Sequence, residues 1–156
     1  MSDAARDKEV AILGAGMHEW GKWGNYFVTY GVGAIREAIA DAGVDYRDIQ
    51  FVAGAATVRN GYPGYVAGAT FAQAMGWTGV QISTSYAACA SGTQAIASAR
   101  AQILAGVCDV ALVVGADTTP KGFLAPSRGE RGDDPDWLRF RLLGATNPVS
   151  YTHLRA

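Results

Sequence analysis

Residues 83–96 read STSYAACASGTQAI and decide the fold. The start of this stretch has the composition of a strand, and the rest opens a helix of small and aliphatic side chains. The long polar side chains of that helix are few: Gln94, Arg100 and Gln102. Because no broad polar face exists, we expect the helix to be largely buried, with Cys89 at the junction between strand and helix.

A cysteine in the first turn of a helix is a candidate nucleophile. The first N–H groups of a helix have no intrahelical partner, and the dipole places positive charge there, so both favour thiolate over thiol. The thiolate is the form that attacks in covalent catalysis, and its position therefore makes Cys89 a candidate catalytic residue. The alternative interpretation is a small buried hydrophobe, as many free cysteines are.

The segment that follows resembles the nucleophile segment of the thiolase superfamily. The match begins with CASG at residues 89–92 and stays in register to Gly115. The resemblance implies that Cys89 takes up the acyl group of an acyl-CoA as a thioester. Many thiolases carry asparagine three residues before the nucleophile, where this chain has Tyr86. The Ala88-Cys89-Ala90 core also fits the related β-ketoacyl synthases.

Two other stretches are similar to thiolases related to sterol carrier protein X and to bacterial lipid-transfer proteins. One is GAGMHEWGK at residues 14–22, and the other is LGATNP at residues 143–148. A dinucleotide-binding fingerprint would need glycine where Glu19 stands and a helix directly afterwards, so we set that interpretation aside. His18 lies in a glycine-rich loop, and we interpret it as a surface or loop-ordering residue.

Composition restricts the partners. A chain of 156 residues with 49% hydrophobic residues and a formal charge of −1 describes about one soluble globular domain and gives no reason to expect a nucleic-acid partner. The two cysteines lack a Cys-x-x-Cys pair, so we expect neither a disulfide nor a metal site. We expect no membrane span, no cofactor other than the coenzyme A part of the substrate, and a cytoplasmic location.

Apolar runs alternate with helical patterns along the chain. Strands are predicted at residues 10–13, 49–55, 80–84 and 109–115, and helices at residues 30–42, 65–75 and 87–106. This order predicts an α/β fold with helices on both faces of a parallel sheet. The resemblance makes it a thiolase-like mixed, mostly parallel sheet, the first of two similar halves. Cys89 and Asp117 both follow strands and are expected at the carboxyl edge, Asp117 as a solvated turn carboxylate and Cys108 as a packing residue.

The expected organisation has four parts. Residues 1–119 form the thiolase-like N-terminal core, residues 120–148 form a loop or insertion over the active site, residues 149–156 are a non-native truncated tail, and the C-terminal thiolase half is absent. In thiolases an insertion at this place shapes the acyl and pantetheine tunnel. The resemblance therefore makes Trp137, Leu138 and Phe140 candidate substrate-binding residues.

The resemblance implies an acyl-CoA acyltransferase of the thiolase class. It would act on a 3-oxoacyl-CoA or a sterol-like side-chain CoA thioester, and the full-length protein would be a homodimer or a hetero-oligomer with a small acyl-binding subunit. In thiolases the base, the other oxyanion donors and a second cysteine come from the second half, so we expect this chain alone to be inactive. The alternatives are a β-ketoacyl synthase, a thiolase-like subunit of a CoA-ester aldolase, and a non-catalytic lipid-binding protein.

Overall fold

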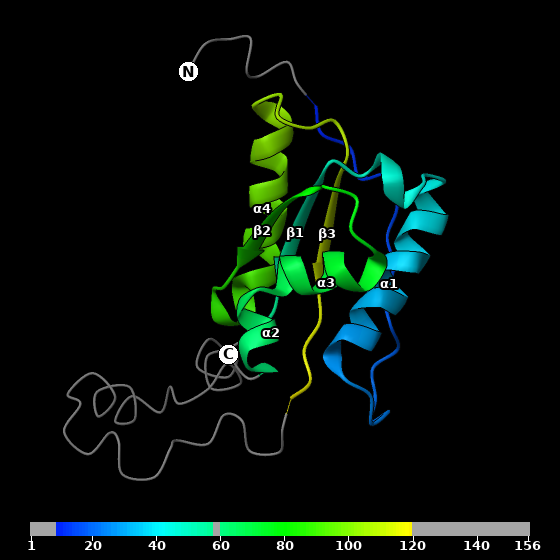
Figure 1. Ribbon diagram of the computed structural model, residues 1–156, viewed down its shortest axis with the longest axis vertical. Helices are drawn as coiled ribbons and strands as arrows, with labels where there is room; N and C mark the ends of the chain where they lie inside the picture. The colour runs from blue at the N-terminus through cyan, green and yellow to red at the C-terminus, as the bar shows by residue number, and fades with distance from the viewer. Residues whose placement is uncertain (1–8, 58–59, 120–156) are drawn as a thin grey trace, which may run out of the picture. The chain divides into compact units, whose positions relative to one another are not determined.

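The computed structural model describes residues 9–57 and 60–119 (Figure 1). All of its helices and strands belong to the first of two compact units, Met1–Thr118. Their order along the chain is α1 (Phe27–Ala42), η2 (Tyr46–Asp48), β1 (Phe51–Ala55), α2 (Tyr62–Tyr65), α3 (Ala67–Met75), β2 (Gln81–Ser85), η4 (Ala88–Ala90), α4 (Ser91–Leu104) and β3 (Ala111–Gly115).

The three described strands form one parallel sheet in the order β2-β1-β3. The register places Val52 of β1 opposite Ile82 of β2 and Leu112 of β3. The central strand β1 is buried along its whole length, whereas β2 is mostly accessible. A parallel sheet buried at its centre is the arrangement that the alternation of strands and helices predicted.

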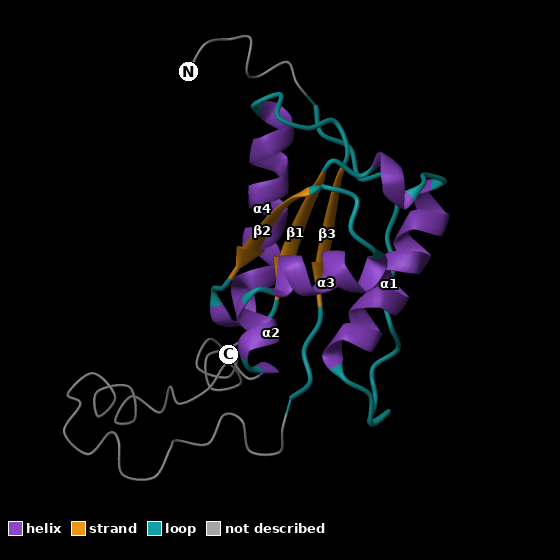
Figure 2. Ribbon diagram, viewed as in Figure 1, coloured by secondary structure: helices purple, strands orange, loops and turns teal. Residues whose placement is uncertain are grey.

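Helices cover both faces of this sheet (Figure 2). Because successive side chains of a strand point to opposite faces, β1 feeds two separate cores. Val52 joins Phe27, Phe71 and other side chains beneath α1 and α3. Phe51 and its alternate neighbours in β1 pack instead against α4. The α/β fold with helices on both faces is therefore confirmed.

Two glycines let α3 approach the sheet closely. A Cβ built on Gly54 of β1 would overlap the backbone of Gly68 in α3, and a Cβ on Gly68 would overlap the carbonyl of Ser83 in β2. The Gly68 N–H donates to Oγ1 of Thr84 at 3.0 Å. Backbone therefore packs directly on backbone where α3 crosses the two strands.

The strand predicted at residues 10–13 does not form. Ile12 is 88% exposed, and residues 10–13 belong to no strand of the described sheet. A strand requires a neighbour that accepts and donates its backbone hydrogen bonds, and none of the described strands pairs with this one. An apolar run in the sequence indicates what a segment is able to bury, but it carries no information about whether a partner strand is present.

The segment after it runs along α1 instead. Its N–H groups at Ala15 and Met17 donate to the carboxylates of Asp41 at 2.9 Å and Glu37 at 2.8 Å, which lie one turn apart on the helix. Gly14 and Gly16 allow this contact, because a Cβ on either would overlap the backbone of α1. The Gly-x-Gly pair therefore packs against a helix side and opens no phosphate-binding turn.

The expectation of a largely buried α4 is also wrong for the described residues. Only Ser91, Ala95 and Ala99 of this helix are buried, and Ile96 is 56% exposed. The reason is that the sheet covers one face of α4, while no other described element covers the opposite face. Among the described residues, no helix is both long enough and apolar enough to span a membrane.

Candidate active site

Cys89 lies in a tight turn between the end of β2 and the start of α4. It is the central residue of the 3-10 turn η4, which ends at Ala90 directly before α4, and it is exposed. The first hydrogen bond of the turn runs from the Ala90 N–H to the Ala87 carbonyl at 2.9 Å. The N–H groups of Ala88 and Cys89 come before that bond in the chain. The strand, turn and helix therefore follow the order that the sequence indicated around Cys89.

The turn is strained and is held by a serine that sequence reasoning overlooked. Ala88 has φ of 47°, in the left-handed region that disfavours residues with a Cβ. The Ser91 hydroxyl accepts from the Ala87 N–H at 2.9 Å and donates to the Ala88 carbonyl at 2.7 Å. Ser91 is only 5% exposed, so the hydroxyl end of both bonds is buried, whereas Ala87 and Ala88 are exposed. The serine therefore fixes the backbone on the N-terminal side of Cys89.

Asp117 is exposed, as expected for a solvated turn carboxylate, but it is also bonded to the neighbouring loop, which the sequence did not indicate. Its Oδ1 accepts from the Thr57 N–H at 2.9 Å, from the Thr57 hydroxyl at 3.0 Å and from the Asn60 side-chain amide at 2.5 Å. Asn60 is 7% exposed, and its Oδ1 accepts from the Thr118 N–H and hydroxyl. This network ties the chain after β1 to the chain after β3.

Cys89 and Asp117 lie at the same carboxyl edge of the sheet but are separated. Cys89 follows β2 and Asp117 follows β3, and β1 lies between these two strands. Neighbouring strands are about 4.8 Å apart, so the strands that precede Cys89 and Asp117 are separated by two such spacings. Asp117 therefore fixes the loops of this edge, because its carboxylate accepts hydrogen bonds from Thr57 and Asn60.

The second cysteine is a packing residue, as the sequence indicated. Cys108 is 4% exposed and lies in the core between β1 and α4. Burial raises the pKa of the Cys108 thiol, and the adjacent Asp109 carboxylate raises it further. Both effects disfavour the thiolate, so the two thiols of the chain are placed in opposite environments.

His18 orders a loop. Its Nδ1 lies 2.8 Å from the Glu19 carbonyl oxygen, and its ring meets the rings of Trp23 and Tyr30 edge to face. The predicted tunnel residues Trp137, Leu138 and Phe140 lie outside the described residues. Within the described residues, no group of three or more histidine, cysteine or carboxylate side chains is placed to hold a metal ion.

The family described as "Thiolase, N-terminal domain" matches residues 10–121. The chain belongs to the thiolase family. Thiolase-like proteins are acyltransferases or synthases, and the matched residues include the whole turn around Cys89. No curated protein matches this thiolase chain.

Among solved structures, the chain is similar to 3-oxoacyl-[acyl-carrier-protein] synthase III from Aquifex aeolicus VF5. The two share 22% sequence identity with a TM-score of 0.52, and the match covers 64% of this chain and 32% of that one. At this identity the likeness shows the fold. The thiolase chain spans about a third of the length of that structure.

The anchoring residues of the site were not evident from the sequence. Asn60 stands in the run Arg59-Asn60-Gly61, where asparagine is an ordinary turn residue, and nothing local marks its amide as buried. The position of Asp117 directly after a predicted strand indicated the carboxyl edge of the sheet, but its bond partners lie 57 to 60 positions away in sequence. Ser91, two residues after the candidate nucleophile, is the one local signal that could have indicated how the turn is held.

Proposed function

We propose that the complete protein is an acyl-CoA acyltransferase of the thiolase class that carries its acyl intermediate on Cys89. The observation that carries the proposal is the exposed Cys89 in a fixed, strained turn within a matched thiolase N-terminal domain. Strain is retained at functional sites where surrounding bonds enforce it, and here the two Ser91 bonds do so. A thiol in this position is presented to a substrate in the way of a nucleophile elbow.

The proposed reaction starts with attack of the Cys89 thiolate on the 3-oxo carbonyl of a 3-oxoacyl-CoA. A C–S bond forms, and the carbonyl electrons move to oxygen. Collapse of this oxyanion breaks the bond between carbons 2 and 3 and releases acetyl-CoA as an enolate, which takes a proton from an acid. The thiol of a second coenzyme A then attacks the Cys89 thioester, so the acyl group leaves as a shortened acyl-CoA and Cys89 is restored.

The Cys89 turn has part of what this reaction needs. The N–H groups of Ala88 and Cys89 precede the first hydrogen bond of η4, so the proposal assigns them as donors to the oxyanion that develops at Cys89. Among the described residues, no hydrogen bond joins Cys89 to a histidine or a carboxylate that could serve as base or acid. We therefore propose that the base and the acid come from a C-terminal half, and that the 156-residue chain alone does not turn over.

The experiment uses this chain extended by the C-terminal half from its own reading frame. The extended protein is incubated with acyl-labelled short-chain acyl-CoA, digested, and analysed by mass spectrometry. We expect an acyl group, labile to hydroxylamine, on the peptide that contains Cys89. Cys89→Ser should remove the label, whereas Cys108→Ser, in which the buried thiol is changed, should retain it. A wild-type protein without label, or a label that persists in Cys89→Ser, would contradict the proposal in favour of the aldolase-subunit or lipid-binding alternative.

The β-ketoacyl synthase alternative rests on the Ala88-Cys89-Ala90 core. A synthase also acylates its cysteine, so the second step distinguishes the two activities. A thiolase cleaves a 3-oxoacyl-CoA when free coenzyme A is added. A synthase instead condenses the acyl group with a malonyl thioester and releases carbon dioxide. Condensation without thiolysis would assign the synthase activity to the same Cys89 turn.

We also propose that the protein pairs with a second copy through β2. This strand is at the edge of the described sheet, and its outer backbone groups face no described strand. An open edge is a template for pairing, and a second copy would pair it by twofold symmetry. Ile82→Pro would remove an N–H from this edge strand. Sedimentation of the extended protein should show a dimer for wild type and a smaller species for Ile82→Pro; a wild-type monomer at micromolar concentration would contradict the pairing.

A further inference from the structure

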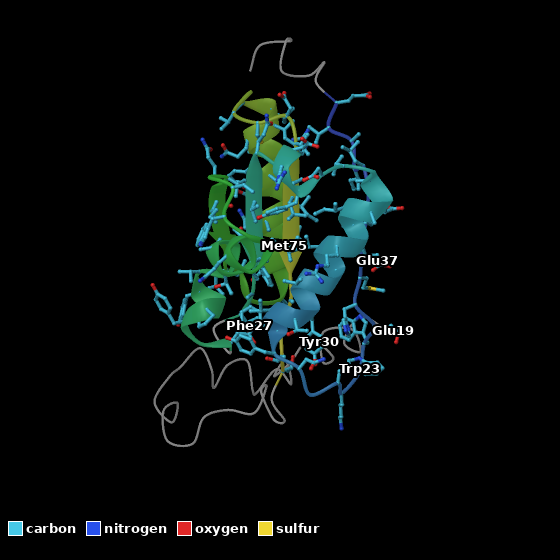
Figure 3. All side chains as sticks on the ribbon, turned by 45° about the vertical axis from the view of Figure 1, so that its right-hand side comes forward. Glu19, Trp23, Phe27, Tyr30, Glu37 and Met75 are labelled. Carbon is cyan, nitrogen blue, oxygen red and sulfur yellow. The ribbon has the colours of Figure 1, made fainter. Side chains whose placement is uncertain are left out.

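A cavity lies on the opposite side of α1 from the core, well apart in sequence from the Cys89 turn. This cavity is open to solvent, with a volume of about 440 Å³, and all of its lining residues except the half-buried His18 are exposed. It is formed by the loop at residues 17–25 and by α1, and its lining is Met17, His18, Glu19, Trp23, Asn25, Gly33 and Glu37. Figure 3 shows Glu19, Trp23, Tyr30 and Glu37 on the side of α1 that faces away from Phe27 and Met75.

The loop that forms one wall is held in place by its own hydrogen bonds. The Met17 N–H donates to Oε2 of Glu37 at 2.8 Å, which joins the loop to α1. The Trp23 indole N–H donates to the Glu19 carbonyl at 3.0 Å, which folds the loop on itself. Further along, the Asn25 N–H donates to the Tyr30 hydroxyl at 2.9 Å. A wall fixed in this way requires little ordering when a ligand binds.

The hydrogen bond of His18 leaves an acceptor free on its ring. A carbonyl oxygen can only accept, so the 2.8 Å contact with the Glu19 carbonyl places the proton on Nδ1. In the neutral ring Nε2 then carries a lone pair. Gly33 lies beside Cδ2, the carbon next to Nε2, and a Cβ at Gly33 would come within 3.6 Å of it. A larger residue at this position would cover the edge of the ring that bears the acceptor.

The other polar groups of the lining are also mainly acceptors. Glu19 and Glu37 contribute two carboxylates, and no lysine or arginine lines the cavity. Glu37 uses only Oε2 to hold Met17, which leaves its second oxygen available. The indole N–H of Trp23 is already bonded, so Trp23 offers its ring, which attracts cations, and no donor. The lining is therefore complementary to a group with positive charge and several N–H donors.

We propose that this cavity binds a small primary alkylammonium compound. The ammonium group donates to Nε2 of His18 and to the free carboxylate oxygen of Glu37, and Trp23 lies against its charge. Met17 and the rest of the indole supply apolar surface for the alkyl chain. The proposal concerns a site separate from the Cys89 turn and does not depend on the acyl-transfer function.

The test is a titration of the 156-residue chain with n-butylammonium chloride, followed by NMR of the indole N–H signals. We expect a saturable shift of the Trp23 signal. The Trp77 signal serves as an internal reference, because Trp77 is not part of the lining. Sodium butyrate and n-butanol have similar chains without the ammonium group and should leave the Trp23 signal unchanged. Equal shifts with butyrate or butanol, or no saturable shift with butylammonium, would overturn the proposal.

Two variants isolate the contribution of the charge on Glu37. Glu37→Gln keeps a side-chain oxygen for the Met17 N–H but removes the negative charge, and we expect the dissociation constant of butylammonium to rise about tenfold. Asp41→Asn makes the same change one turn further along α1, where the carboxylate holds Ala15 outside the cavity, and binding should be unchanged. Equal weakening in both variants would mean that the loss of one negative charge anywhere on α1, or a disordered loop, causes the effect. That result would contradict the site. If Glu37→Gln does not fold, the comparison of butylammonium with butyrate on wild type still decides.

Discussion

The hydroxyl of Ser91 donates a 2.7 Å hydrogen bond to the carbonyl of Ala88, which has a positive φ although it is not glycine. The same hydroxyl accepts from the N–H of Ala87, so one buried oxygen is bonded on both sides of the strained peptide. Local hydrogen bonds of this kind are how a protein retains a conformation that costs about 1–3 kcal/mol. The position of Cys89 thus depends on a side chain two residues further along the chain.

Ser91→Ala is expected to destabilise the protein and to release the turn. Removing the buried hydroxyl takes away its hydrogen bonds to the Ala87 N–H and the Ala88 carbonyl, which should cost about 1–3 kcal/mol. Urea unfolding gives the free energy, and NMR of the backbone tests whether Ala88 keeps its positive φ. Ser98→Ala is the matched control, since the Ser98 hydroxyl makes only a 3.4 Å contact with Ser83. A Ser91→Ala protein as stable as the control would show that the turn does not depend on the serine.

The two thiols are expected to differ in their rate of alkylation. Cys89 is exposed, whereas Cys108 is buried and its pKa is raised by desolvation and by Asp109. Access and thiolate content both limit the reaction, so iodoacetamide at neutral pH should modify Cys89 faster by on the order of tenfold or more. Mass spectrometry of timed digests measures both rates. In concentrated urea the alkylation rates of the two cysteines should converge. Rates that stay unequal in urea would show that neighbouring residues in the sequence, and not the fold, cause the difference.

Cys108 should also make stability depend on alkaline pH. Its pKa is raised from 9.0 in the folded state, so the unfolded chain loses this proton first as the pH rises. Above about pH 9 the unfolded state then binds fewer protons than the folded state, and the free energy of unfolding falls with pH. Cys108→Ala should flatten this decline relative to wild type in urea titrations at several pH values. If the free energy of unfolding fell equally steeply with pH in both proteins, burial of the Cys108 thiol would not contribute to the pH dependence of stability.

The sequence predicted the fold where local pattern was sufficient. The alternation of apolar strands and helices indicated the parallel sheet, and its central strand Phe51–Ala55 is buried as a continuous apolar run predicts. The segment at residues 10–13 has the same kind of apolar run but forms no strand, because pairing depends on a neighbour that may lie anywhere in the chain. In the same way, the small residues of α4 showed that it could pack on all sides, but not which faces are covered.

The candidate site was predictable to a different degree. Cys89 was identified because strand, turn and helix follow one another directly in the chain, so that its position is a local property. The partners of Asp117 were missed because Thr57 and Asn60 are brought to it only when β1 and β3 pair. Contacts across a sheet of this kind leave no periodic signal in the sequence.

Gly54→Ala and Gly92→Ala are expected to have opposite effects. A Cβ on Gly54 would overlap the backbone of Gly68, which cannot move without separating α3 from the sheet, so we expect a loss of about 2–3 kcal/mol or failure to fold. A Cβ on Gly92 in α4 meets nothing within 4 Å, and alanine is the better helix former by up to about 1 kcal/mol. Thermal unfolding of both variants measures the contrast. A Gly54→Ala protein as stable as wild type would contradict the direct contact between α3 and β1.

Asn60 is expected to be more important for stability than its place in a loop suggests. Its amide donates to Asp117, and its oxygen accepts twice from Thr118, so one side chain links the chain after β1 to the chain after β3. Asn60→Ala removes these bonds at a 7% exposed position and should cost about 1–3 kcal/mol.

Asn60→Asp provides the sharper comparison for this network. The replacement has nearly the same shape and still accepts from Thr118, but it loses the donor to Asp117 and sets two carboxylates against each other. At neutral pH we expect it to be less stable than Asn60→Ala. When the pH is lowered, protonation of one carboxyl restores a donor between the two residues, so Asn60→Asp should recover relative to Asn60→Ala. Urea unfolding at neutral and acidic pH measures this change, and a constant difference between the variants would show that Asn60 and Asp117 are not in direct contact.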